Sequence, residues 1–112
     1  DVARTVGPFF EDYDIYLSPT LGKPPVPIGA IDPKIPDWNE YFGIMFDFMP
    51  FTSLFNVTGS AGVSLPLWWN DGDLPIGSQF VTRMGRDGLL LQLSAQLERA
   101  QPWADRRPQI CS

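Results

Sequence analysis

The chain has 112 residues, 44% of them hydrophobic and 19% charged, and its formal net charge is −5. This length allows one domain or part of one, and the composition is typical of a folded chain and not of a disordered one. Five of the eight basic side chains follow residue 82, so the larger, preceding part is strongly acidic. An acidic body argues against nucleic acid as a partner, because phosphates need a basic surface.

The sequence contains no histidine and one cysteine, Cys111. The lack of histidine excludes Ser-His-Asp and Cys-His catalysis and most zinc sites, so we expect no metal and no cofactor. A single cysteine cannot form an internal disulfide, and we interpret Cys111 as an exposed thiol without a role. Residues 48–70 carry no charge, but Pro50 and Pro66 interrupt them, so no membrane partner is expected.

The first third of the chain predicts a helix, a strand and a long loop. Residues 2–11 are helix-like, with a break at Gly7-Pro8. Residues 14–17 are rich in β-formers and end at Ser18-Pro19, which predicts a short buried strand. The stretch from about 19 to 36 holds six of the twelve prolines and is predicted to be an ordered, extended loop.

Two short helices are expected between this loop and residue 59. Asp37 is suited to cap the first helix, with Glu40 three residues later as in a capping box. Pro50 ends this helix and suits the first turn of the next one. Gly59 is expected to end the second helix.

The last third predicts a β-hairpin at about 61–82 and a helix at about 87–100. The hairpin joins strands at 63–67 and 76–82 through a turn at 70–73. Apolar residues recur at helical spacing in the final segment, at Leu89, Leu90, Leu93, Leu97 and Ala100. We expect Asp87 to cap this helix, Pro102 to end it, and Trp103 to fold back onto the core.

Several short motifs follow one another along nearly the whole chain. They are residues 14–20 (DIYLSPT), 56–59 (NVTG), 64–66 (SLP), 74–79 (LPIGSQ) and, after the leucine-rich helix, Pro102-Trp103. In this order and spacing they resemble the C-terminal part of the amidase signature family, which hydrolyses carboxamides. Ser60-Ala61-Gly62 departs from the Gln-Pro-Ala that is common in the family and indicates a divergent member. The proline-rich loop and the 103–108 ending are similar to amidases of the 6-aminohexanoate cyclic-dimer hydrolase type.

The resemblance implies that residues 1–112 are a C-terminal fragment of a single amidase domain. The implied fold is α/β: part of an α/β/α arrangement with a mixed sheet that includes the hairpin and the C-terminal helix. The family uses a Ser nucleophile in a Ser-Ser-Lys triad, and the resemblance places that triad upstream of this chain. No residue here is therefore assigned to catalysis, and the isolated chain is expected to be inactive. The implied partners are the remainder of the amidase chain and a small amide substrate; the implied location is the cytoplasm, and a homodimer of the full enzyme is compatible with the resemblance.

Four residues before the NVTG motif are candidates for substrate binding: Met45, Phe48, Met49 and Thr52. The resemblance puts their segment at the border of the substrate pocket, where adaptable methionines and aromatic rings shape a wall. Plain core packing is the alternative interpretation of the same residues. Trp68-Trp69 is compatible with a stacking platform, but strand geometry favours one ring facing inward and one facing outward.

A different class of function is also compatible with the sequence. A non-enzymatic interaction module would use an aromatic groove, with the proline-rich loop as a ligand or a lid. Within that loop, residues 24–27 can adopt polyproline II. The ordered motifs favour the amidohydrolase.

Overall fold

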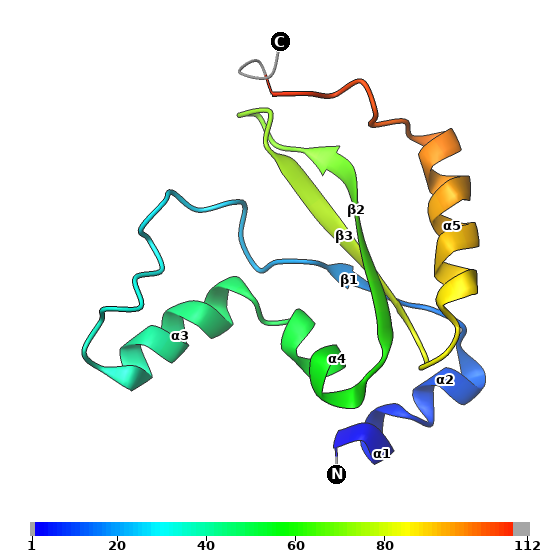
Figure 1. Ribbon diagram of the computed structural model, residues 1–112, viewed down its shortest axis with the longest axis horizontal. Coiled ribbons are helices and arrows are strands. Elements are labelled where there is room, and N and C mark those ends of the chain that lie inside the picture. The colour runs from blue at the N-terminus through cyan, green and yellow to red at the C-terminus, as the bar shows by residue number, and fades with distance from the viewer. Residues whose placement is uncertain (1, 109–112) are drawn as a thin grey trace.

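The computed structural model describes residues 2–108, so Cys111 and its interpretation lie outside the described residues. The elements, in chain order, are α1 (Val2–Val6), α2 (Phe9–Asp12), β1 (Tyr16–Pro19), α3 (Trp38–Phe48), α4 (Thr52–Thr58), β2 (Ala61–Trp69), β3 (Pro75–Thr82) and α5 (Asp87–Ala100) (Figure 1). The predicted break at Gly7-Pro8 separates α1 from α2. α5 covers the same residues as the helix predicted from the leucine spacing.

The three strands form one sheet in the order β1-β3-β2, and every pairing among them is antiparallel. β3 is central and pairs with β2 as a hairpin. The mixed sheet implied for the whole fold is therefore represented here only by antiparallel pairs. Both outer strands present one edge that no other described strand covers.

β1 corrects one prediction. The strand expected at 14–17 is observed two residues later, and it is an edge strand and not a buried one: Leu17 is 62% exposed and Ser18 is its buried residue. Asp14 has a different role, since its carbonyl oxygen accepts a hydrogen bond of 2.8 Å from Thr82 Oγ1. This bond holds the chain before β1 against the end of β3.

The hydrophobic core lies between α5 and one face of the sheet. Leu65 of β2, Phe80 of β3 and Leu90 of α5 form the buried cluster. Around it pack seven partly buried residues: Ile15, Ala61, Val63, Leu67, Leu93, Leu97 and Trp103. The expected return of Trp103 to the core is thereby confirmed. Alternation along the strands explains why these positions share a face.

The opposite face of the sheet is covered in part by α4. Phe55 of α4 is buried, and its ring lies 5.0 Å from that of Tyr16 in β1. Tyr16 is paired with Val81 of β3, which is fully buried. Helices therefore pack on both faces of this sheet, as an α/β fragment of a layered fold requires (Figure 1).

The helix ends follow local chemistry with one exception. Asp37 caps α3 by accepting a hydrogen bond of 2.8 Å from Asn39 N, and Gly59 ends α4 in the left-handed conformation with φ 69°. The prediction that Asp87 caps α5 is wrong, because Arg86 occupies the cap position and gives no side-chain bond. Asp87 instead lies in the first turn, where a carboxylate interacts favourably with the helix dipole.

The proline-rich loop runs from β1 out to α3 and is fixed at several points (Figure 1). Gly22 N donates a hydrogen bond of 2.9 Å to the carbonyl of Phe48, at the end of α3. Lys23 forms an ion pair with Asp47 beside it. The predicted ordered character of the loop is confirmed by these contacts. Among the described residues, no helix has both the length and the apolar character needed to cross a membrane.

Candidate functional site

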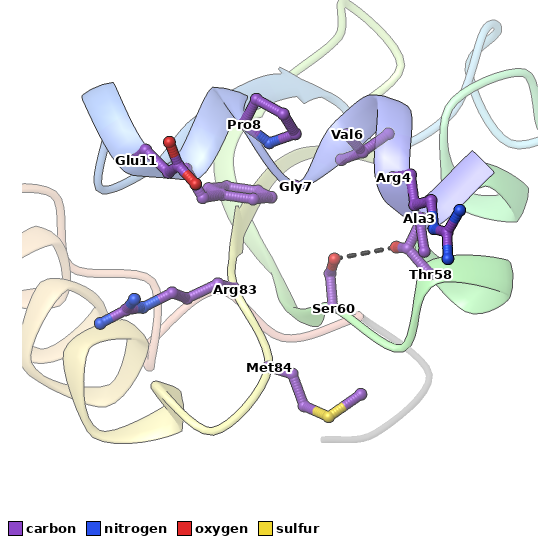
Figure 2. A pocket seen from close by; sticks show the side chains of 11 residues that line it. Ala3, Arg4, Val6, Gly7, Pro8, Glu11, Thr58, Ser60, Arg83 and Met84 are labelled. Atoms are coloured by element: carbon purple, nitrogen blue, oxygen red, sulfur yellow. Dashed lines mark hydrogen bonds between the residues drawn. The ribbon is translucent and has the colours of Figure 1, made fainter. Parts of the chain in front are cut away.

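The largest pocket described lies where the N-terminal helices meet the chain after α4 and after β3. Its volume is about 400 Å³. Thr58 and Ser60 of the NVTG turn line it together with Arg83 and Met84, which follow β3. Figure 2 shows Arg83 and Glu11 on the side of the pocket away from Thr58. One of the resemblance motifs thus borders a cavity.

The two hydroxyls in this pocket form a short chain of hydrogen bonds. Thr58 Oγ1 donates to the carbonyl of Phe55 at 3.2 Å, so its proton is engaged. The 2.8 Å contact between Thr58 and Ser60 therefore has Ser60 as the donor, and Figure 2 marks this bond. Both protons stabilise the end of α4, and neither hydroxyl is paired with a general base. The pocket can hold a small polar molecule, but these hydroxyls are not activated nucleophiles.

A second polar feature lies on the sheet face that carries Tyr16. Gln79 and Ser18 are buried, with Gln79 Nε2 donating to Ser18 Oγ at 3.3 Å. Nearby, Thr20 Oγ1 and Ser64 Oγ lie 2.5 Å apart, close to Gly77 of β3. A pocket of about 260 Å³ opens beside this pair. β1, β2 and β3 each supply a member of this polar row.

The four predicted substrate-binding residues lie together at the junction of α3 and α4. Met45 and Phe48 are on α3, Met49 follows its last residue, and Thr52 begins α4. All four are half-buried. Met49 N donates to the carbonyl of Met45 at 2.7 Å, which closes the last turn of α3. Their predicted role in substrate binding stays a prediction.

Neither of the two pockets above is lined by these four residues. Conversely, sequence reasoning did not select Ser60 and Arg83 or the polar row as site residues. The NVTG and LPIGSQ motifs were the available signals, since Thr58 and Gln79 belong to them. What was missing is the spatial relation, because the residues involved are separated by up to 61 positions, as in the Ser18–Gln79 bond.

The described residues contain no group of three or more His, Cys, Asp or Glu side chains placed to hold a metal ion. The acidic pair Asp71 and Asp73 lies in the hairpin turn. Asp73 faces Arg106 at 3.6 Å, so this carboxylate has an ion-pair partner.

Comparison with known proteins gives a consistent result. The family model described as "Amidase" matches residues 1–91. A 6-aminohexanoate-cyclic-dimer hydrolase of Pseudomonas sp. (strain NK87) is 50% identical over 62 residues, which cover 55% of this chain and 13% of that protein. An acylamidase of Rhodococcus erythropolis is 31% identical over 111 residues, which cover 96% of this chain and 22% of that protein.

Solved structures agree. A structure of 6-aminohexanoate cyclic dimer hydrolase superposes with a TM-score of 0.86 and 35% identity, over 98% of this chain and 24% of that one. A glutamyl-tRNA(Gln) amidotransferase from Thermotoga maritima superposes with a TM-score of 0.71 and 25% identity, over 93% of this chain and 21% of that one. The chain spans about a fifth of the length of the curated relatives that match most of it. Its ordered motifs, its sheet and these matches together show that the chain belongs to the amidase signature family.

Proposed function

We propose that this chain is part of a longer amidohydrolase that cleaves carboxamide bonds to a carboxylate and an amine. The nucleophile is a Ser of a Ser-Ser-Lys triad, supplied by a part of the protein outside these 112 residues. The observation that carries the proposal is the superposition of nearly the whole chain on a fraction of a larger amidase. The substrate class is a small amide.

The hydrogen bonds of this chain support a nucleophile located elsewhere. Ser60 and Thr58 donate their protons within the turn, and Thr20 and Ser64 bond to each other. Lys23 is held by Asp47 at the surface and bonds to no hydroxyl. A Ser-Lys pair needs the amine within hydrogen-bond reach of the hydroxyl it activates.

The apolar surface of α3 supports a missing structural partner. Trp38, Phe42 and Phe46 follow one another at a spacing of four residues, and their rings stack with centroids 5.7 and 6.2 Å apart. All three are exposed, from 43% to 71%. Such a contiguous apolar stripe is characteristic of a contact surface. We assign the remainder of the amidase chain as the element that covers it.

The same stripe is the observation that favours the alternative function, a non-enzymatic interaction module. In that case a separate protein would occupy the aromatic surface and the full-length protein would have no hydrolytic activity. The activity assay below separates the two functions.

The test is hydrolysis by the full-length protein that contains this chain. We expect release of amine and carboxylate from at least one of a series of aliphatic amides, anilides and the cyclic dimer of 6-aminohexanoate. The isolated 112-residue chain should give no turnover above background. Turnover by the isolated chain that disappears in Ser60→Ala or Ser64→Ala would overturn the location of the nucleophile, and an inactive full-length protein would favour the interaction module.

Within this proposal, Met49 and Thr52 are expected to select the substrate and leave the chemical step unchanged. Met49→Ala enlarges a pocket wall, so it should favour bulkier acyl groups in kcat/KM by about ten- to a hundredfold at most, the effect of one or two methylenes in an apolar pocket. Thr52→Val keeps the side-chain shape and tests whether the hydroxyl contributes. A wall that contacts ground and transition states equally changes KM and not kcat.

The measurement is steady-state kinetics of both variants in the full-length protein across a series of acyl chains. A uniform fall in kcat for every substrate, with the melting temperature unchanged, would mean that these residues belong to the catalytic machinery. Unchanged selectivity would assign them to the core.

A further inference from the structure

A third pocket, of about 320 Å³, lies at the tip of the β2–β3 hairpin, at the opposite end of β3 from Arg83. The chain after α5 returns to this tip (Figure 1). Its apolar walls come from Trp69, Leu74 and Pro75 of the hairpin and from Trp103 after the helix. Arg106 and Arg107 complete the lining. None of the residues assigned to the proposed function above belongs to this pocket.

The hairpin side of the pocket is held in shape by the turn. Asn70 Oδ1 accepts hydrogen bonds from Gly72 N at 3.0 Å and from Leu74 N at 2.9 Å. Asp73 adopts a positive φ of 56° between them. An Asx-type turn of this kind fixes the backbone, so Leu74 and Pro75 are presented in one position.

The other side is held by Arg106. Its guanidinium lies over the Trp69 ring, with Cζ 4.1 Å from the ring centroid, and its Nη1 is 3.6 Å from Asp73 Oδ1. Arg106 N also donates to the carbonyl of Trp103 at 3.0 Å, which closes a turn in the returning chain. A cation over an aromatic face and an opposite charge beside it both favour this position of Arg106.

The charge of Arg106 is therefore compensated, and that of Arg107 is not. Within residues 2–108, Arg107 has no ion-pair or hydrogen-bond partner, although it lines the same pocket. The result is a concave surface with aromatic and aliphatic walls and one uncompensated guanidinium, in a chain whose net charge is −5. A guanidinium presents a planar set of N–H donors that matches a carboxylate.

We propose that this pocket binds a small monocarboxylate with an apolar body, such as a medium-chain alkyl or an arylalkyl acid. The carboxylate lies at Arg107, and the apolar body lies against Trp69, Leu74, Pro75 and Trp103. Arg106 acts as a structural support for the Trp69 wall and not as the primary anion ligand. The inference rests on the geometry of this pocket and does not depend on the proposed function.

The experiment uses the full-length protein labelled with 5-fluorotryptophan, with the ¹⁹F resonances of Trp69 and Trp103 assigned through Trp69→Phe and Trp103→Phe. Hexanoate is the probe, and 1-hexanol is its uncharged counterpart. We expect hexanoate to move both resonances with a saturating curve and a Kd of about 1 mM, typical of one weak charged contact plus apolar burial. The Trp38 resonance, on α3, should not move.

Arg107→Gln is expected to weaken hexanoate binding about tenfold, the worth of one charge-assisted hydrogen bond. Arg83→Gln removes an equal charge at the other end of β3 and should leave the Kd unchanged. Equal affinity for hexanol and hexanoate, or an unchanged Kd in Arg107→Gln, would overturn carboxylate recognition. No movement of either resonance far above about 1 mM would overturn the site itself.

Discussion

Leu90→Ala is expected to lower the free energy of unfolding by about 2–5 kcal/mol, the range for truncating a buried leucine. Leu90 is 5% exposed and is the residue through which α5 joins Leu65 and Phe80 in the core cluster. Truncation of its side chain to a methyl group leaves a cavity between a helix and a sheet. Both elements are fixed by their own hydrogen bonds, so they can close only part of it.

Leu91→Ala provides the control, because Leu91 is the next residue of the same helix and is 70% exposed. Its effect should stay within about 0.5 kcal/mol, as for other surface changes. Leu93, partly buried beside the cluster, should lie between the two. The measurement is chemical denaturation of the full-length protein. Equal midpoints for Leu90→Ala and Leu91→Ala would contradict the assignment of the buried face of α5.

The elements that depend on neighbouring residues could be predicted from the sequence. The leucine spacing defines α5, Gly59 ends α4, and Asp37 caps α3 through an atom two residues away. Each of these features is decided within one or two turns of chain. The side chain at such a position selects the local backbone conformation almost alone.

The sheet order could not be predicted in the same way. β1 pairs with β3, and the Tyr16–Val81 pair joins residues 65 positions apart. The β-rich stretch at 14–17 indicated that a strand exists, but its register is set by β3 and by the Thr82–Asp14 bond. The strand therefore begins at Tyr16 and lies at the edge, where Leu17 is exposed until another element covers it.

The Trp68-Trp69 pair shows how far alternation reaches. One ring was expected to face inward and one outward, and Trp68 is 68% exposed while Trp69 is partly covered by Arg106. The register irregularity between Leu65 and Trp68 does not change this outcome. That Arg106 is the covering residue, and that a pocket forms beside it, followed from no local pattern. The contact joins residues on either side of the whole of α5.

Gly77→Ala is expected to lower the free energy of unfolding by about 1–3 kcal/mol, as overpacking of an interior site does. A Cβ at Gly77 would lie 2.5 Å from Ser64 Oγ and 2.6 Å from Thr20 Oγ1. It would also lie 3.0 Å from Thr20 Cβ, so a rotation of the hydroxyls alone does not make room. Thr20 N is bonded to the carbonyl of Gly77 at 3.0 Å, which prevents the two chains from separating freely.

Gly62→Ala is the matched control, because Gly62 lies on the neighbouring strand β2 and a Cβ there meets only Val81 Cγ2 at 3.7 Å and the Phe80 carbonyl at 3.9 Å. Replacing a strand glycine without a clash restricts the unfolded chain, so this variant should gain about 0.5–1 kcal/mol. The two alanines are thus expected to have opposite signs. Adding Ser64→Gly to Gly77→Ala removes the nearest atom and should recover part of the loss. A Gly77→Ala protein as stable as Gly62→Ala, by denaturant midpoint in the full-length enzyme, would mean that the close approach of β1 and β2 over β3 is not maintained in solution.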